Sequence, residues 1–104
     1  MAQISNKIDL PVRQFMEAVK KNYKIQAAYL FGSYAKQTEN KWSDIDIALV
    51  SEDFSKDLFD ARVNLLRLAA RIDDRIEPIP YNRENFNQDD PLVHEIRKNG
   101  IPIA

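Results

Sequence analysis

The chain contains no cysteine and only one histidine. Disulfide bonds and thiolate metal sites are therefore excluded, and this chain alone cannot build a metal site from several histidines. Any metal ion that it binds is expected to be a hard cation that prefers oxygen ligands. The remaining candidates for ligands are the side chains of aspartate and glutamate.

Neither sign of charge is in excess, since 15 Lys and Arg residues face 16 Asp and Glu residues, for a net charge of -1. Proteins that bind long nucleic acids usually carry a basic excess, so we expect no such partner, whereas a single nucleotide is compatible with this charge. The sequence also lacks an apolar run of membrane-spanning length, and its first seven residues lack the apolar stretch of a secretory signal. These absences predict a cytoplasmic protein that does not associate with a membrane.

What is present is the composition of one small globular unit. The 104 residues are 44% hydrophobic and 30% charged, which is typical of a soluble domain with a modest core. We therefore expect residues 1–104 to form a single domain. Helical spacing of apolar residues predicts helices over residues 10–23, 56–72 and 91–98. In the second of these, one broad apolar stripe is expected from Leu58, Phe59, Val63, Leu65, Leu66, Ala69 and Ala70.

Short apolar runs predict strands over residues 25–31, 43–50, 75–80 and 101–103. The connector between the first two strands is too short for a crossover helix, which favours an antiparallel pair. The prolines at positions 78 and 80 indicate an edge strand or the end of a strand. Together these features predict an α+β fold built on a small mixed sheet.

Asp44 and Asp46 lie two residues apart in an apolar strand, so their side chains project from the same face. Both faces of this strand look buried, because Ile45, Ile47 and Leu49 alternate with Ala48 and Val50. Two carboxylates roughly 6 to 7 Å apart repel by about 2 to 3 kcal/mol at an effective dielectric near 20. A divalent cation reverses the sign of this interaction, and Mg2+ prefers carboxylate oxygens.

A Gly-Ser turn precedes this acidic pair. Gly32 allows backbone conformations that a Cβ would forbid, and Ser33 offers a hydroxyl and an amide where a helix could begin, an arrangement suited to phosphate binding. A third carboxylate would complete a two-metal site, and Glu77 in the next expected strand is the best candidate, with a surface residue of an edge strand as its other interpretation. Asp73 and Asp74 are its rivals, but we interpret them as the solvated end of the preceding helix.

Four other polar or aromatic residues are candidates for a functional role. Lys36 and Lys41 follow the Gly-Ser turn and are interpreted as solvated loop lysines. His94 is interpreted as a surface or packing residue rather than a proton shuttle. Trp42 has two interpretations that the sequence leaves open, stacking on a base or capping the core.

These residues resemble a known family. Gly32-Ser33, ten further residues and then Asp44-Ile45-Asp46 are similar to the signature of the DNA polymerase beta superfamily of nucleotidyltransferases. The small size resembles the minimal nucleotidyltransferases (MNT) that act as antitoxin-like partners of HEPN-domain proteins. The resemblance extends from Ile25 to Ile79. It implies the nucleotidyltransferase, palm-like fold, with helices packed mainly on one face of the sheet.

The resemblance also implies roles for individual residues. Gly32 and Ser33 would bind the phosphates of the nucleotide. Asp44, Asp46 and Glu77 would be the catalytic residues and would bind two Mg2+ ions, with Mn2+ as a possible substitute. Two positions depart from the pattern of many relatives: Gln37 stands where they carry a glycine, and Glu77 stands where they often carry aspartate.

The implied activity is the transfer of AMP from ATP to a hydroxyl of a partner protein, a HEPN-type toxin that this antitoxin would silence. The alternative is a non-catalytic antitoxin or nucleotide-binding module that neutralises its partner by binding. An antibiotic-modifying nucleotidyltransferase is a third interpretation, which the absence of a drug-binding domain disfavours. The expected edge strand at residues 101–103 favours pairing with another chain, as a homo- or hetero-oligomer.

Overall fold

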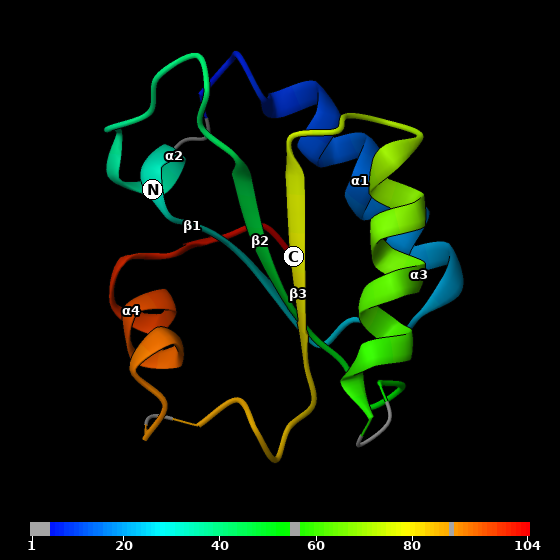
Figure 1. Cartoon of the computed structure of the whole chain (residues 1–104). Helices are drawn as coiled ribbons and strands as arrows, with labels where there is room; N and C mark the ends of the chain where they lie inside the picture. The colour runs from blue at the N-terminus through cyan, green and yellow to red at the C-terminus, as the bar shows by residue number, and fades with distance from the viewer. Residues whose placement is uncertain (1–4, 55–56, 88) are drawn as a thin grey trace.

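A computed structural model describes residues 5–54, 57–87 and 89–104 of the chain. Helices and strands alternate along the sequence (Figure 1). Their bounds are α1 (Asp9–Asn22), β1 (Ala27–Phe31), α2 (Ser33–Lys36), β2 (Ile45–Val50), α3 (Leu58–Ala70), β3 (Ile76–Tyr81), α4 (Pro91–Asn99) and β4 (Ile101–Pro102). No helix within the described ranges is long and apolar enough to cross a membrane.

The four strands form one sheet in the order β3-β2-β1-β4. β1 runs antiparallel to both β2 and β4, whereas β2 and β3 are parallel, so the predicted mixed sheet is confirmed. β3 and β4 are the two edge strands. This explains the prolines at positions 78 and 80, because an edge strand has no neighbour on one side and tolerates a missing backbone donor there.

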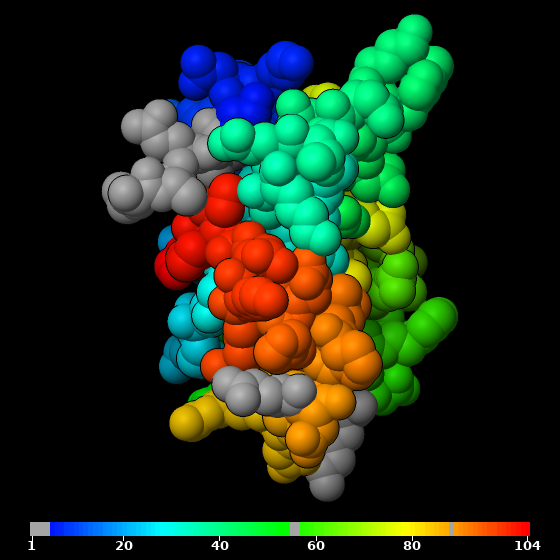
Figure 2. Space-filling model, turned by 90° about the vertical axis from the view of Figure 1, so that its left-hand side faces the viewer, coloured from blue at the N-terminus to red at the C-terminus, as the bar shows by residue number. Residues whose placement is uncertain are grey.

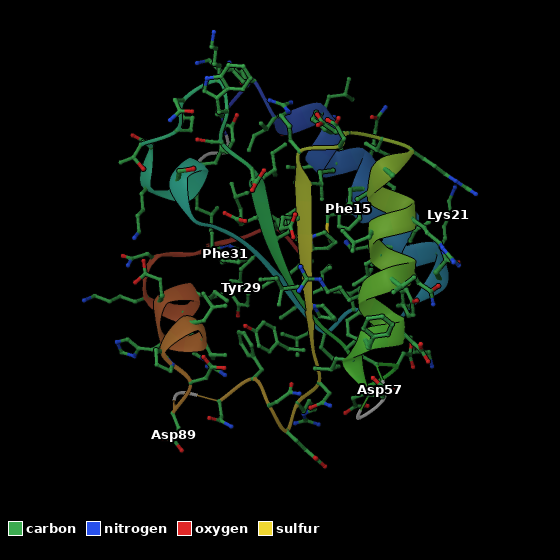
Figure 3. The ribbon with its side chains drawn as sticks, viewed as in Figure 1. Phe15, Lys21, Tyr29, Phe31, Asp57 and Asp89 are labelled. Carbon is green, nitrogen blue, oxygen red and sulfur yellow. The ribbon has the colours of Figure 1, made fainter. Side chains whose placement is uncertain are left out.

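The two faces of the sheet are covered by different helices, with α1 and α3 on one side and α4 on the other (Figure 1). Ile45, Ile47 and Leu49 of β2 belong to the core cluster with α1 and α3, which also contains Phe15, pointing from α1 toward the sheet (Figure 3). Ala48 belongs to the second cluster, which includes residues of α4. Both faces of β2 are therefore buried, as its sequence predicts, and the two longest helices share one face.

The apolar stripe predicted for α3 is partly wrong. Phe59 is 70% exposed and Leu66 is 37% exposed, whereas Ala61, Leu65 and Ala69 are buried against the sheet. Residues four apart return to nearly the same side of a helix, but Phe59 precedes Ala61 by two residues and so projects about 200° away from it. The side of the helix that carries Phe59 therefore faces solvent, although its sequence predicts that it is part of the core.

Several predicted boundaries also differ from those observed. β2 begins at Ile45, so Asp44 lies one residue before the strand rather than within it. α3 begins at Leu58, where the side chain of Asp57 accepts a hydrogen bond from the amide of Phe59. The predicted start of this helix at Lys56 lies outside the described residues. The polar connector after β1 contains one helical turn, α2, which begins at Ser33.

Candidate active site

Gly32 joins β1 to α2 with a φ of 76° and a ψ of -152°, a conformation that is essentially restricted to glycine. The pairing of β1 with β2 sets Phe31 opposite Asp46, which brings the next residue, Gly32, beside the Asp46 carboxylate. A Cβ built on Gly32 would lie only 2.2 Å from Asp46 Oδ2. Glycine is therefore required here both by the backbone conformation and by the carboxylate that lies against it.

Asp46 is the central carboxylate of the site. The parallel pairing of β2 with β3 sets Glu77 opposite Asp46, so both side chains project from the face of the sheet that α4 covers. Partial burial raises the pKa of Asp46 to about 6, and the negative charges of Asp44 and Glu77 contribute further to this rise. The three predicted acidic residues are therefore close enough to influence one another, at the edge of the sheet where β1 ends and β2 and β3 begin.

Glu77 also forms an ion pair with an arginine side chain. Arg62 Nη2 from α3 donates a hydrogen bond to Glu77 Oε1 over 2.9 Å, and both side chains are partly exposed. Within the described part of the chain, no group of three acidic or histidine side chains is arranged so that it could hold a metal ion. Glu77 therefore lies beside the aspartates in register while its carboxylate is engaged by Arg62.

The α2 turn is held in place by side chains on both sides. Tyr34 is buried in the core, and its hydroxyl accepts a hydrogen bond of 3.4 Å from Arg75 Nη1. Lys36 Nζ lies 2.7 Å from Glu95 Oε1 on α4. These contacts tie the segment that follows Gly32 to the start of β3 and to α4, and they fix its position beside Asp46.

The rivals of Glu77 lie outside the acidic group. Asp73 accepts hydrogen bonds from the backbone and the guanidinium of Arg75, and this bonding lowers the pKa of Asp73. Asp74 is exposed at the turn after α3. The interpretation as the solvated end of a helix agrees with Asp74, but it is wrong for Asp73, whose side chain is only 16% exposed.

The remaining candidates lie at the surface. His94 is exposed on α4, as expected for a surface residue. Trp42 is 80% exposed, so the interpretation in which it caps the core is wrong. Lys36 is engaged by Glu95, and the ammonium of Lys41 lies 4.9 Å from the centre of the Trp42 ring.

Sequence reasoning missed Arg62 and Arg75. Arg62 lies on the exposed side of α3, 15 residues before the glutamate that it binds. Arg75 lies 41 residues after the tyrosine that it contacts. Neither residue belongs to a motif, and only the packing of α3 and α2 around the edge of the sheet brings each to its partner.

The arrangement thus combines a glycine turn, the start of a short helix and three acidic residues at one end of the sheet. Residues 13–104 match the family model described as "Polymerase beta, Nucleotidyltransferase". The match covers most of the chain, and the chain belongs to this family of nucleotidyltransferases.

The chain is also similar to chains of solved toxin–antitoxin structures. The chain resembles a chain of a crystal structure described as a toxin-antitoxin with AMP-PNP, with 26% identity and a TM-score of 0.65 over 86% of this chain and 69% of that one. It also resembles a chain of a structure described as tri-AMPylated Shewanella oneidensis HEPN toxin in complex with MNT antitoxin, with 25% identity and a TM-score of 0.61. That similarity covers 89% of this chain and 68% of the other.

A putative nucleotidyltransferase from Sulfolobus solfataricus shares the fold over 98% of this chain and 89% of its own, with 20% identity and a TM-score of 0.58. No curated protein matches the chain. The neighbours of known structure therefore support both the nucleotidyltransferase fold and the resemblance to minimal nucleotidyltransferases of toxin–antitoxin pairs.

Proposed function

We propose that this protein transfers AMP from ATP to a hydroxyl of a HEPN-type toxin, and that it acts as the antitoxin of the pair. Three findings support this proposal: the family membership of residues 13–104, the resemblance to chains of toxin–antitoxin structures, and the acidic group beside the Gly32 turn. The observation that carries it is the close approach of Gly32 to Asp46, because it sets a phosphate-binding type of turn directly against a carboxylate.

The acidic residues offer the carboxylate oxygens that a divalent cation prefers, although among the described residues the three side chains are not arranged as a metal site. The negative charges of Asp44 and Glu77 disfavour the ionised form of Asp46, and a cation with oxygen ligands would relieve this repulsion. We propose that Asp44, Asp46 and Glu77 hold two Mg2+ ions, for which Mn2+ could substitute. Such ions, when bound, activate an acceptor oxygen and neutralise the charge of a leaving pyrophosphate.

The other residues of the site would orient the nucleotide. Gly32 has no side chain that would keep a phosphate away from its backbone, and the amide and hydroxyl of Ser33 lie at the start of α2, where donors are free of helical partners. The contacts of Tyr34 and Lys36 hold this turn in place before any ligand binds. Little rearrangement of the turn is therefore needed to receive a triphosphate.

A labelling experiment tests the transfer. The product of the neighbouring gene is co-purified with this protein and incubated with Mg2+ and ATP labelled at the α-phosphate. We expect the partner to become labelled, and we expect Asp44→Asn with Asp46→Asn to abolish the label. The matched control is Asp60→Asn with Asp89→Asn, which removes the same charge from exposed positions on α3 and at the far end of the molecule (Figure 3). Undiminished labelling by the first double variant would overturn the catalytic assignment.

The ion pair between Arg62 and Glu77 favours the alternative of a non-catalytic antitoxin, since it neutralises one proposed ligand without a metal ion. Calorimetry separates the two functions. Binding of the partner that is equally tight with and without ATP and Mg2+, together with no gain of AMP on the partner, would identify a module that acts by binding alone.

A further inference from the structure

The connector between α2 and β2 ends in a turn with a defined shape, residues 40–43, which we name the Trp42 turn. The side chain of Asn40 accepts a hydrogen bond of 2.8 Å from the amide of Trp42. The hydroxyl of Ser43 accepts one of 2.9 Å from the amide of Asn40, and the amide of Ser43 donates to the carbonyl of Asn40 over 3.1 Å. Three hydrogen bonds within four residues hold this turn.

The turn presents an indole ring to solvent. Trp42 is 80% exposed, and among the described residues it is the most exposed of the large hydrophobic side chains, ahead of Phe59 at 70%. In Figure 2 the green segment that contains the turn stands out from the body of the molecule. The ammonium of Lys41 lies over the ring, 4.9 Å from its centre, so the turn displays an aromatic ring and a positive charge together.

The turn lies at the entrance to the acidic site. Trp42 precedes Asp44 by two residues, so their Cα atoms are at most about 7 Å apart. The connector follows α2, which begins directly after Gly32, and Figure 1 shows it extending beyond the start of β2 before the chain enters that strand. A protein that covers the turn and extends along the connector would therefore also reach the start of β2, where Asp44 and Asp46 lie.

We propose that the Trp42 turn is the anchor for the acceptor protein, with the indole ring inserted into an apolar pocket of that protein and Lys41 paired with a carboxylate at the rim of the pocket. The inference rests on the proposed function, since it names how the partner of that reaction is held. An anchor at this position would place the surface of the partner, and a hydroxyl on it, over Asp44 and Asp46.

A protein pocket suits this geometry better than a nucleotide base does. Lys41 already lies over one face of the ring, and the segment stands out from the body of the molecule, so a stacked base would cover at most the other face of the indole. A pocket would cover the whole projecting ring, which buries on the order of 200 Å² for a tryptophan. Fully desolvated tryptophans of this kind dominate protein–protein interfaces, and a fixed turn lowers the entropy lost when they dock.

The protein has a single tryptophan, so a spectroscopic probe of tryptophan reports on this turn alone. The full chain is labelled with 5-fluorotryptophan, and its one fluorine resonance is followed by NMR during titration with the unlabelled neighbouring gene product. We expect the resonance to shift and broaden when the complex forms, and we expect no change with ATP and Mg2+ alone. A shift produced by ATP and Mg2+ alone that is as large as the shift produced by the partner would overturn the proposal in favour of base stacking.

Substitutions test how much Trp42 contributes to the affinity for the partner. We expect Trp42→Ala to raise the Kd for the partner at least about tenfold while the Kd for ATP is unchanged, and we expect Trp42→Phe to restore most of the affinity. The control is Phe59→Ala, which removes another largely exposed ring, from α3, and should leave both constants unchanged. A Kd for the partner that is unaffected by Trp42→Ala would overturn the anchor.

The two proposals fail in different ways. If the fluorine resonance shifts with the partner but the partner gains no AMP, the anchor stands and the transfer activity is wrong. If AMP is transferred while the fluorine resonance of the unsubstituted chain does not move with the partner and Trp42→Ala binds the partner with unchanged affinity, the transfer stands and the anchor is wrong. A resonance that shifts with protein concentration in the absence of the partner would instead identify a contact between two copies of the chain and overturn the proposal.

Discussion

Gly32 and Asp46 lie so close together that a Cβ on Gly32 would fall 2.2 Å from Asp46 Oδ2. Because the conformation of Gly32 is also unfavourable for other residues, Gly32→Ala should strain the turn by roughly 1 to 3 kcal/mol and push the carboxylate out of the site. We expect nucleotide transfer to fall by at least about 100-fold, with a chain that still unfolds cooperatively. A thermal melt and the labelling assay measure the two effects, and activity near that of the unsubstituted protein would show that the contact has no role in the reaction.

The raised pKa of Asp46, about 6, predicts how stability depends on pH without a divalent cation. Because this pKa lies above the value of about 3.9 in an unfolded chain, the folded state binds more protons between these values. This contribution favours folding below about pH 4 and is lost as pH rises through 6. Asp46→Asn should therefore raise the Tm by a few degrees at pH 7.5, and the difference should shrink toward pH 4. A variant that is less stable at pH 7.5 would contradict the raised pKa.

The ion pair between Arg62 and Glu77 predicts competition with metal ions. If Glu77 is a metal ligand, Arg62→Gln should free its carboxylate and remove a positive charge near the cation. We expect the affinity for Mn2+, measured by the paramagnetic resonance of the free ion, to rise about three- to tenfold. Arg67→Gln removes the same charge from a later turn of α3 and serves as the control. Equal affinities in both variants would place Glu77 outside the metal site.

The orientation of α3 predicts which of its residues support the fold. Leu65 is fully buried, so Leu65→Ala should lower the free energy of unfolding by about 2 to 5 kcal/mol. Phe59 is 70% exposed, and Phe59→Ala should change it by less than about 0.5 kcal/mol. Urea denaturation of the two variants checks this difference. A larger loss for Phe59→Ala would mean that α3 is rotated relative to the sheet.

The periodicity of the sequence was sufficient to predict the mixed sheet. Alternation along residues 43–50 identified a strand buried on both faces, and the short connector before it favoured an antiparallel neighbour. Periodicity was insufficient for α3, where apolar residues lie on more than one side of the helix. The contact with the sheet then decides which side is buried, and a single sequence does not contain that information.

The candidate site likewise contains features that the sequence could predict and features that it could not. The spacing of Gly32, Asp44 and Asp46 was visible in the sequence because the strand period and the glycine requirement are local properties. The register that sets Asp46 beside Glu77 depends on two parallel strands separated by α3, and the sequence offered Glu77 only as the best of three acidic candidates. Arg62 and Trp42 acquire their significance only from the structure, one from an ion pair and the other from its exposure.

The intact mass of the neighbouring gene product, incubated with this protein, ATP and Mg2+, tests the central claim most directly. We predict a gain equal to one or more AMP groups, which disappears when Asp44 and Asp46 are both replaced by asparagine. A partner that binds this protein and is neutralised by it, yet keeps its original mass, would contradict the account.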